Sequence, residues 1–167
     1  MPMSDGGLSL NEFGDLIERP STRFRRQAEE LRKGVGVPAR AMGRLDELGT
    51  WLAAAQSRVP VAPIERPRAV LFAGDHGVAE LGVSARPRDA APALVRRTLA
   101  GSSPVAILAR NAGATLRVVD LSLDCEPDEL PEDVTRHRVR RGSGRLDIED
   151  TLTAEEAERA FRAGVAV

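Results

Sequence analysis

The chain has 167 residues, which is enough for one domain of ordinary size or slightly more. Its 24 basic and 25 acidic residues give a net charge of −1, so overall charge does not draw the chain to nucleic acid or to an acidic membrane. A hydrophobic content of 42% is typical of a globular protein and argues against disorder of the whole chain.

The sequence predicts a cytoplasmic protein without a membrane segment. No apolar run approaches the roughly 18 residues of a membrane-spanning helix, and the first residues have neither the basic nor the apolar region of a signal peptide. The single cysteine, Cys125, can form neither an internal disulfide nor a thiolate metal cluster, so we expect no metal site. Its acidic neighbours Asp124 and Glu126 disfavour the thiolate and make it a poor nucleophile.

The first part of the chain is predicted to be helical. Ser9 and Glu12 have the spacing of a capping box, which opens a short helix that Pro20 ends. Ser21, or the threonine after it, caps a second helix, and the glycines from Gly34 onward close it.

A third and longer helix is expected from about residue 38 to residue 58. Apolar residues recur there at steps of three and four and form one stripe, with Trp51 at its edge. The members of this stripe are Met42, Leu45, Leu48, Leu52 and Ala55. We expect the stripe to be a packing face.

Residues 59–68 contain three prolines and are predicted to be an extended linker, because proline does not fit inside a helix. After this segment, the sequence pattern changes from one typical of helices to one that begins with a strand. Residues 69–73 are an uninterrupted apolar run, which indicates a strand covered on both faces, as in a parallel sheet.

The middle of the chain has the pattern of a right-handed βαβ crossover. After the first strand, helices are expected at about residues 90–100 and 102–113, the second with a serine cap and Pro104 in its first turn. A second strand is expected at residues 115–121. Strand, helices and strand in this order favour the α/β class.

The remaining residues add loops and one further helix. Residues 122–134 are acidic and loop-like, and residues 137–141 are a candidate third strand. Thr153 and Glu156 form a second capping box at the start of a helix. Because a crossover helix without a following strand is an incomplete unit, we expect an incomplete sheet.

The strongest local signal for a site is the segment Gly74-Asp75-His76-Gly77, directly after the first strand. In open α/β sheets, ligands bind at the carboxyl ends of the strands. Asp75 and His76 are an adjacent acid–imidazole pair suited to proton transfer, and the glycines allow close backbone approach. The pair is equally consistent with a structural role, in which Asp75 bonds the loop and His76 braces it.

Two further segments allow more than one interpretation. Gly142-Ser143-Gly144 could bind phosphate through its backbone N–H groups, but it lacks the spacing of known nucleotide motifs, so a plain turn is favoured. The arginines of residues 136–141 form a basic cluster. A solvated strand edge or a salt-bridged face is the usual meaning of such a cluster, and nucleic-acid binding would need more basic surface.

Several motifs in a fixed order resemble one known family. They are Phe72-Ala73-Gly74-Asp75-His76-Gly77-Val78, Gly82-Val83-Ser84 with Pro87, Leu99-Ala100-Gly101, Val105 to Arg110, Ala112-Gly113-Ala114, Arg117 to Asp120, Val139 to Gly144 and the helix start at Thr153; upstream, Gly43 to Leu48 also matches. Together they resemble the nicotinate-nucleotide–dimethylbenzimidazole phosphoribosyltransferase family of cobalamin biosynthesis over about residues 38–167, its N-terminal part.

The resemblance implies a domain organisation. Residues 1–58 would be N-terminal helices belonging to a small helical domain, residues 59–68 the linker, and residues 69–167 the first part of a large α/β domain. The implied fold is a Rossmann-like parallel sheet, incomplete here and preceded by the helical region. The family enzyme is a homodimer when full length.

The resemblance also implies an activity. The family transfers the phosphoribosyl group of nicotinate mononucleotide to 5,6-dimethylbenzimidazole, giving α-ribazole 5′-phosphate and nicotinate without a cofactor. Its catalytic glutamate and its Gly-rich phosphate loop match no residue of this chain, so no catalytic residue is assigned. The alternative is a truncated, non-catalytic fragment or an interaction module that is inactive alone.

The residues that can be carried over concern the aromatic base. Val83, Arg86 and Leu94 match positions of the benzimidazole pocket, and the residues matched as organising the adjacent loop are Gly74, Asp75, His76 and Gly77. The chain departs from the family pattern at Arg86, where Ser or Tyr is common, and at Leu94, where Gln is common. These departures bear on which base the pocket accepts.

Overall fold

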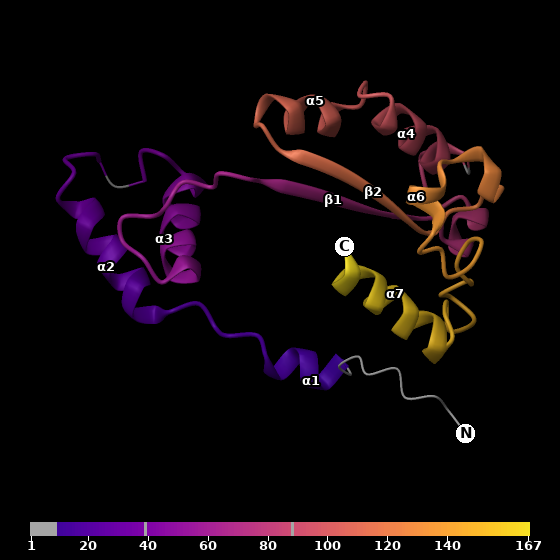
Figure 1. Cartoon of the computed structure of the whole chain (residues 1–167), viewed down its shortest axis with the longest axis horizontal. Coiled ribbons are helices and arrows are strands. Elements are labelled where there is room, and N and C mark those ends of the chain that lie inside the picture. The colour runs from indigo at the N-terminus through magenta and orange to yellow at the C-terminus, as the bar shows by residue number, and fades with distance from the viewer. Residues whose placement is uncertain (1–9, 39, 88) are drawn as a thin grey trace. The chain divides into compact units, whose positions relative to one another are not determined.

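A computed structural model describes residues 10–38, 40–87 and 89–167 (Figure 1). The chain divides into two units, Met1–Glu65 and Arg66–Val167. The division falls inside the proline-containing segment, where residues 59–67 form neither helix nor strand. The assignment of whole domains to these ranges stays a prediction.

The described residues of the first unit form three helices: α1 (Leu10–Asp15), α2 (Thr22–Lys33) and α3 (Arg44–Gln56). The second helix begins and ends as expected, because the Ser21 hydroxyl accepts a hydrogen bond from the Phe24 N–H at 3.5 Å and Gly34 is the C-cap. The predicted cap of the first helix, Ser9, lies outside the described residues.

The third helix is shorter than predicted. Arg40 and Gly43 have positive φ angles of 62° and 55°, which a right-handed helix does not allow. The helix therefore begins only at Arg44, and it ends at Gln56, just before Ser57, whose φ is 48°.

The apolar stripe of α3 is not the buried face, which corrects the prediction. Met42, Leu45 and Leu48 are all more than half exposed within the described chain. The buried residues of the helix are Ala53 and Ala54 instead, at 1% exposure each. The N–H of Ser21 donates to the carbonyl of Ala54 at 3.0 Å, and only small side chains permit such close approach of two backbones.

The second unit contains the predicted parallel pair of strands. β1 (Arg68–Gly74) pairs with β2 (Thr115–Ser122) over most of their length, beginning with Arg68 opposite Thr115. The crossover between them carries α4 (Ala90–Leu99) and α5 (Pro104–Asn111). The α/β class is confirmed.

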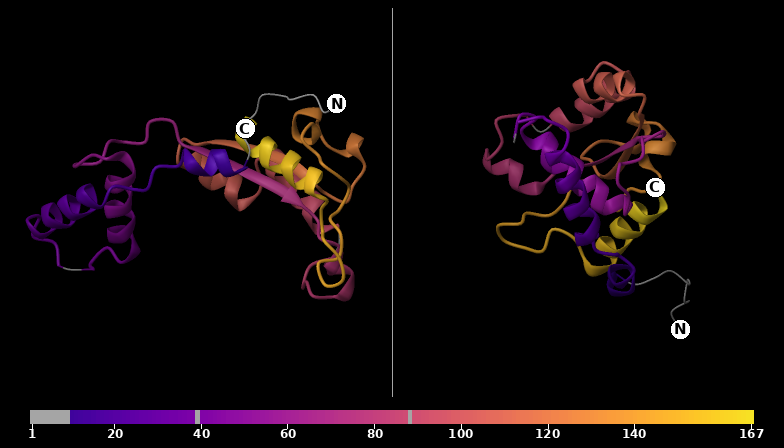
Figure 2. Two further views of the ribbon diagram at one scale, coloured as in Figure 1. Left: turned by 90° about the horizontal axis from the view of Figure 1, so that it is seen from below. Right: turned by 90° about the vertical axis from the view of Figure 1, so that its left-hand side faces the viewer.

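The shorter elements of this unit are the 3₁₀ helices η1 (Gly77–Leu81) and η2 (Pro127–Glu129), the short helix α6 (Glu132–Thr135) and the final helix α7 (Ala154–Ala166). Helix α7 begins at the predicted capping box, with the Glu156 N–H bonded to the Thr153 hydroxyl and the Thr153 N–H bonded to the Glu156 carboxylate. Helices α4 and α5 cover one face of the sheet and α7 lies on the other (Figures 1 and 2).

The candidate third strand at residues 137–141 does not form. One ladder-like bond, from the Val139 N–H to the Leu121 carbonyl at 2.9 Å, joins this segment to β2. The segment is held instead by its arginines, because Arg138 bonds Asp120 and Arg140 bonds the Thr151 carbonyl.

The core of the second unit lies beside β2. Val119 and Asp120 are fully buried, and one cluster of buried residues contains Val95, Val118, Leu123, Cys125, Leu130 and Val134. By contrast, Phe72 of β1 is 49% exposed, so the expectation that residues 69–73 are covered on both faces is wrong for the described chain. Gly164 of α7 faces the Phe72 ring, since a Cβ atom on this glycine would lie 4.0 Å from it, and it has no side chain to cover the ring.

In the described part of the chain, no helix is long and apolar enough to cross a lipid bilayer.

Candidate functional site

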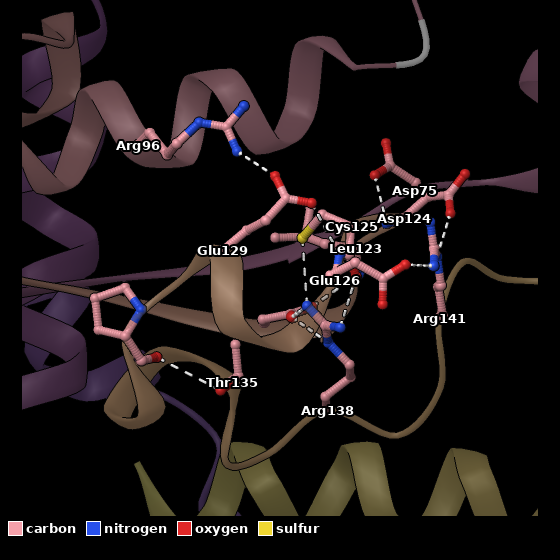
Figure 3. Close-up of polar contacts among 12 residues, drawn as sticks. Asp75, Arg96, Leu123, Asp124, Cys125, Glu126, Glu129, Thr135, Arg138 and Arg141 are labelled. Carbon is pink, nitrogen blue, oxygen red and sulfur yellow. Dashed lines mark hydrogen bonds and ion pairs between the residues drawn. The ribbon is translucent and has the colours of Figure 1, made fainter.

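Three segments meet where β1 and β2 end, and Asp75 connects them. Its backbone N–H donates to the Ser122 carbonyl at 2.9 Å, and its carbonyl accepts from the Ser143 N–H at 2.9 Å. Its side chain accepts from the Asp124 N–H at 2.9 Å (Figure 3). Asp75 is therefore a structural link between the ends of both strands and the turn at residues 142–144.

The two glycines beside Asp75 allow this close contact. A Cβ atom on Gly74 would lie 2.5 Å from the Ser122 hydroxyl, and one on Gly77 would lie 2.9 Å from the Ser143 carbonyl oxygen. Both distances are shorter than van der Waals contact. The strand end and the loop after it therefore require glycine at these positions.

Replacing Gly74 with alanine is expected to destabilise the second unit by about 1 kcal/mol, and replacing Ser122 with alanine in the same protein is expected to remove most of that loss. The clash of the new Cβ is with the Ser122 hydroxyl oxygen, whereas the Ser122 Cβ lies 3.7 Å away, at ordinary contact distance. A double-mutant cycle in urea measures the coupling. Strictly additive effects of the two substitutions would contradict this explanation.

The candidate base-pocket residues line one cavity of about 320 Å³. Val83, Arg86 and Leu94 contribute to its wall, as do Gly74, Asp75 and His76. The remaining lining residues are Val78, Ala79, Ser84, Pro87, Ala90 and Ala91. Gly77 lies outside this cavity and lines a smaller, more polar one of about 150 Å³, which Asp75 and His76 also line.

The turn at residues 142–144 is not an open phosphate-binding loop. The Ser143 N–H is bonded to Asp75, and the Gly144 N–H donates to the Thr151 carbonyl at 2.9 Å. Because both amides already have acceptors inside the chain, neither can bind an anion without breaking a bond. The turn interpretation therefore fits the structure better than the phosphate interpretation.

The arginine cluster is a salt-bridged face. The Arg141 guanidinium bonds Asp124 at 2.8 Å and also contacts Glu126, which raises its pKa, mainly through the hydrogen bonds to these two carboxylates. The Arg140 guanidinium lies 3.4 Å from the Glu156 carboxylate. Each of these charges has an acidic partner, which agrees with the salt-bridged alternative.

A buried ion pair joins Asp120 of β2 to Arg138 and was not expected from the sequence. The Asp120 side chain is fully buried and accepts hydrogen bonds from the Arg138 guanidinium at 2.5 Å and from the Leu123 N–H at 2.8 Å. The same guanidinium donates to the Cys125 carbonyl at 2.9 Å. Burial lowers the pKa of Arg138, but the bonds to Asp120 and Cys125 outweigh this, so its pKa is raised overall. One feature of the sequence could have indicated this pair: the acidic residue Asp120 stands inside the apolar run of the second strand.

Cys125 is expected to react with iodoacetamide in urea and to be protected in the folded protein. The side chain is 4% exposed, and burial raises the pKa of the thiol more than the neighbouring Arg138 lowers it. Mass spectrometry of the alkylated peptide measures the reaction. Equal rates in native and denaturing buffer would show that this part of the core is not formed.

Within the described residues, no group of three or more His, Cys, Asp or Glu side chains is arranged to hold a metal ion.

The sequence profile of a family described as phosphoribosyltransferase matches residues 17–167. The nicotinate-nucleotide–dimethylbenzimidazole phosphoribosyltransferase of Streptomyces avermitilis is 67% identical over 160 residues. The chain belongs to this phosphoribosyltransferase family.

The match covers most of this chain but less than half of the family proteins. The alignments with the phosphoribosyltransferases of S. avermitilis and Streptomyces coelicolor, the latter 62% identical, include 96% of this chain and 43% and 45% of those proteins. A crystal structure of the phosphoribosyltransferase from Thermus thermophilus is similar with a TM-score of 0.70 and 34% identity, over 86% of this chain and 43% of that one. The chain therefore corresponds to a part of a family member.

The family belongs to cobalamin biosynthesis, and the N-terminal helices and two-stranded parallel sheet match part of the solved family fold. The expected family and fold class are thus confirmed. The roles of Val83, Arg86 and Leu94 in base binding, and of the loop around Asp75, stay predictions.

Proposed function

We propose that this chain, together with the further residues that its relatives contain, transfers the phosphoribosyl group of nicotinate mononucleotide to 5,6-dimethylbenzimidazole. The products would be α-ribazole 5′-phosphate and nicotinate. One observation carries the proposal: in a chain 67% identical to an enzyme named for these substrates, the base-pocket candidates Val83, Arg86 and Leu94 line a single cavity.

The chemistry of this cavity suits an aromatic base. Apolar side chains, including Val83, Pro87 and Leu94, offer surface for a flat ring, and Asp75 and His76 add polar groups to the lining. A benzimidazole nitrogen would attack the anomeric carbon of the ribose as the bond from that carbon to the nicotinate nitrogen breaks. The proton lost by the benzimidazole would pass to a base outside this chain, as the resemblance implies.

We propose that the residues around this cavity bind the aromatic base and do not carry out the proton transfer. The connections made by Asp75 fix the loop beside the cavity, and we propose that it acts as a structural group and not as the proton acceptor. We further propose that the full-length enzyme is a cytoplasmic homodimer and that the 167-residue chain alone is inactive.

A chimeric enzyme tests the proposal. Residues of this chain replace the 160 aligned residues of the S. avermitilis relative, and the product is assayed with nicotinate mononucleotide and dimethylbenzimidazole. We expect α-ribazole 5′-phosphate and nicotinate to form in equal amounts. A folded chimera without product would contradict the proposal, and the unmodified S. avermitilis enzyme is the positive control.

Two substitutions in the chimera test the pocket. Arg86→Ser and Leu94→Gln restore residue types that are common at these family positions, and both are expected to change the relative kcat/KM values for different benzimidazoles. Arg162→Gln is a matched control, because its guanidinium pairs with Glu158 on the surface of α7 and lines neither cavity of the site. Unchanged base preference in both pocket variants would remove these residues from the site.

The alternative of an inactive fragment or an interaction module is tested with the 167-residue chain itself. Incubation with both substrates is expected to give no product above the blank. Product at a measurable rate would show that the chain contains a complete active site.

A further inference from the structure

Residues 144–151 form a loop that is closed by its own hydrogen bonds, and we name it the brace loop. The Gly144 N–H donates to the Thr151 carbonyl at 2.9 Å, and the Arg145 N–H donates to the Glu149 carboxylate at 3.0 Å. A Cβ atom on Gly144 would lie 2.7 Å from that carboxylate and 3.2 Å from the Thr151 Cα, so glycine lets the loop close this tightly. These contacts give the brace loop a defined shape, although it contains neither helix nor strand.

The Arg145 side chain connects the brace loop to η1. Its Nη2 and Nε atoms donate to the two carboxylate oxygens of Asp147, at 2.6 and 3.2 Å. Its Cγ atom lies 3.1 Å from the point that a Cβ atom on Gly77 would occupy, so the aliphatic part of Arg145 packs on the first residue of η1. The hydrogen bond to Asp147 raises the pKa of Arg145 more than burial lowers it, and the negative charge of Glu80 on η1 raises it further.

The 3₁₀ helix η1 is a wall that both cavities of the site share. Ala79 lines both of them, and Val78 lines the 320 Å³ cavity. The helix is five residues long and, within the described chain, none of the five is buried. So short a helix has little stability of its own, so the segments beside it determine its position.

One of these segments is the turn that leads into the brace loop. His76 and Ser143 form an isolated parallel bridge, in which the Gly77 N–H donates to the Ser143 carbonyl at 3.1 Å. The His76 Nδ1 atom lies 3.3 Å from the Ser143 hydroxyl oxygen. The bridge fixes the chain just before η1, and Arg145 follows two residues after Ser143 with its contact to Gly77.

We propose that the brace loop sets the position of η1 and, with it, the shape of the cavity for the aromatic base. Arg145 is the positioning residue, because Asp147 holds its guanidinium while its aliphatic part supports Gly77. Arg145 lines neither cavity, so it acts on a ligand only through η1. The identity of the ligand rests on the proposed function, whereas the support of η1 is a property of the ligand-free chain.

The first experiment follows η1 in the ligand-free chain by NMR. The ¹H–¹⁵N spectrum and ¹⁵N relaxation dispersion report on the backbone amides of Val78 and Ala79. In Arg145→Ala, which removes the aliphatic contact and the ion pair together, we expect both amide signals to shift and to show exchange on the μs–ms timescale. Wild-type signals for both amides in Arg145→Ala would overturn the proposal.

Three further variants make this experiment specific. Arg145→Met retains an unbranched apolar side chain and is expected to restore part of the wild-type spectrum of η1. Asp147→Ala leaves the Arg145 side chain in place but frees its guanidinium, so we expect smaller changes of the same kind. Arg96→Met is the matched control, because Arg96 also pairs with one carboxylate, that of Glu129, but lines neither cavity. Changes in η1 of equal size in this control would contradict the role of Arg145.

The second experiment measures the KM for 5,6-dimethylbenzimidazole in the chimera, at saturating nicotinate mononucleotide. We expect Arg145→Ala to raise this KM about three- to tenfold, because binding of the base must then also order η1. The kcat is expected to stay within about twofold, since the bound state is the same once η1 is ordered. Arg145→Met should give an intermediate KM, and Arg96→Met the wild-type value. A lower kcat with an unchanged KM would contradict a role in base binding.

The outcomes separate this proposal from the proposed function. An inactive wild-type chimera would contradict the proposed function, and the spectra of the ligand-free chain would still decide whether Arg145 positions η1. An active chimera whose KM does not respond to Arg145→Ala would overturn the positioning role and leave the phosphoribosyl transfer intact.

Discussion

Replacing Asp120 with alanine is expected to lower the free energy of unfolding of the second unit by about 3–5 kcal/mol. The substitution leaves the Arg138 guanidinium, whose side chain is 12% exposed, without its carboxylate. It also removes the acceptor of the Leu123 N–H. Both groups are buried too deeply for water to replace the lost bonds fully, so this effect is the largest that we expect from a single side chain.

Urea denaturation followed by alkylation of Cys125 measures this loss. Cys125 is a suitable probe because it lies in the core of the second unit, whereas the single tryptophan, Trp51, lies in the first. Asp120→Asn should cost less, since its amide oxygen can still accept from Leu123. Glu158→Gln is the matched control: it breaks an exposed ion pair with Arg162, and a change within about 0.5 kcal/mol is expected. Similar losses for Asp120→Ala and this control would show that the buried pair contributes little.

Replacing Gly77 with alanine is expected to destabilise the second unit by about 1–3 kcal/mol and to weaken benzimidazole binding. The added methyl group would lie 2.9 Å from the Ser143 carbonyl oxygen and 3.0 Å from the Gly144 carbonyl carbon. Both are backbone atoms, so a rotamer change cannot relieve the clash. The turn that carries Ser143 must move away from His76.

The same urea experiment, and a titration of the protein with benzimidazole followed by NMR, check this result. Gly164→Ala is the control within the same unit, because its Cβ would approach nothing closer than the Phe72 ring, at 4.0 Å. In the interior of α7, this change is expected to stabilise by about 0.5–1 kcal/mol. If Gly77→Ala behaves like Gly164→Ala, the two loops have room between them for a methyl group and the close contact is absent.

The ends of α2, the start of α7 and the two paired strands could be predicted from the sequence because local chemistry determines them. Capping by Ser21 and Thr153 depends on residues no more than three positions away, and an uninterrupted apolar run is a sufficient signal for β1. The apolar stripe of α3 failed as a prediction because periodicity shows which residues share a face but not which face packs. The close approach of Ser21 to Ala54 decides that.

The site was also predictable only in part, because a local sequence pattern does not show which distant residues pack together. The loop at residues 74–77 stood out because it follows a strand, and its glycines have clear conformational roles. The pairing of Asp120 with Arg138 and of His76 with Ser143 joins residues far apart in the sequence, and no local pattern marks it. The arginine at 138 stood out only as one member of a basic cluster, although its partner is the most deeply buried acid of the described core.

The parallel pairing of β1 with β2 also determines when this unit can form during protein synthesis. Arg68 pairs with Thr115, so the whole crossover must leave the ribosome before the first strand has a partner. Until then, the segment that contains Leu71 and Phe72 is an apolar chain with unpaired backbone groups. Between the emergence of β1 and the emergence of β2 from the ribosome, the nascent chain is therefore expected to expose a segment that can aggregate or bind a chaperone.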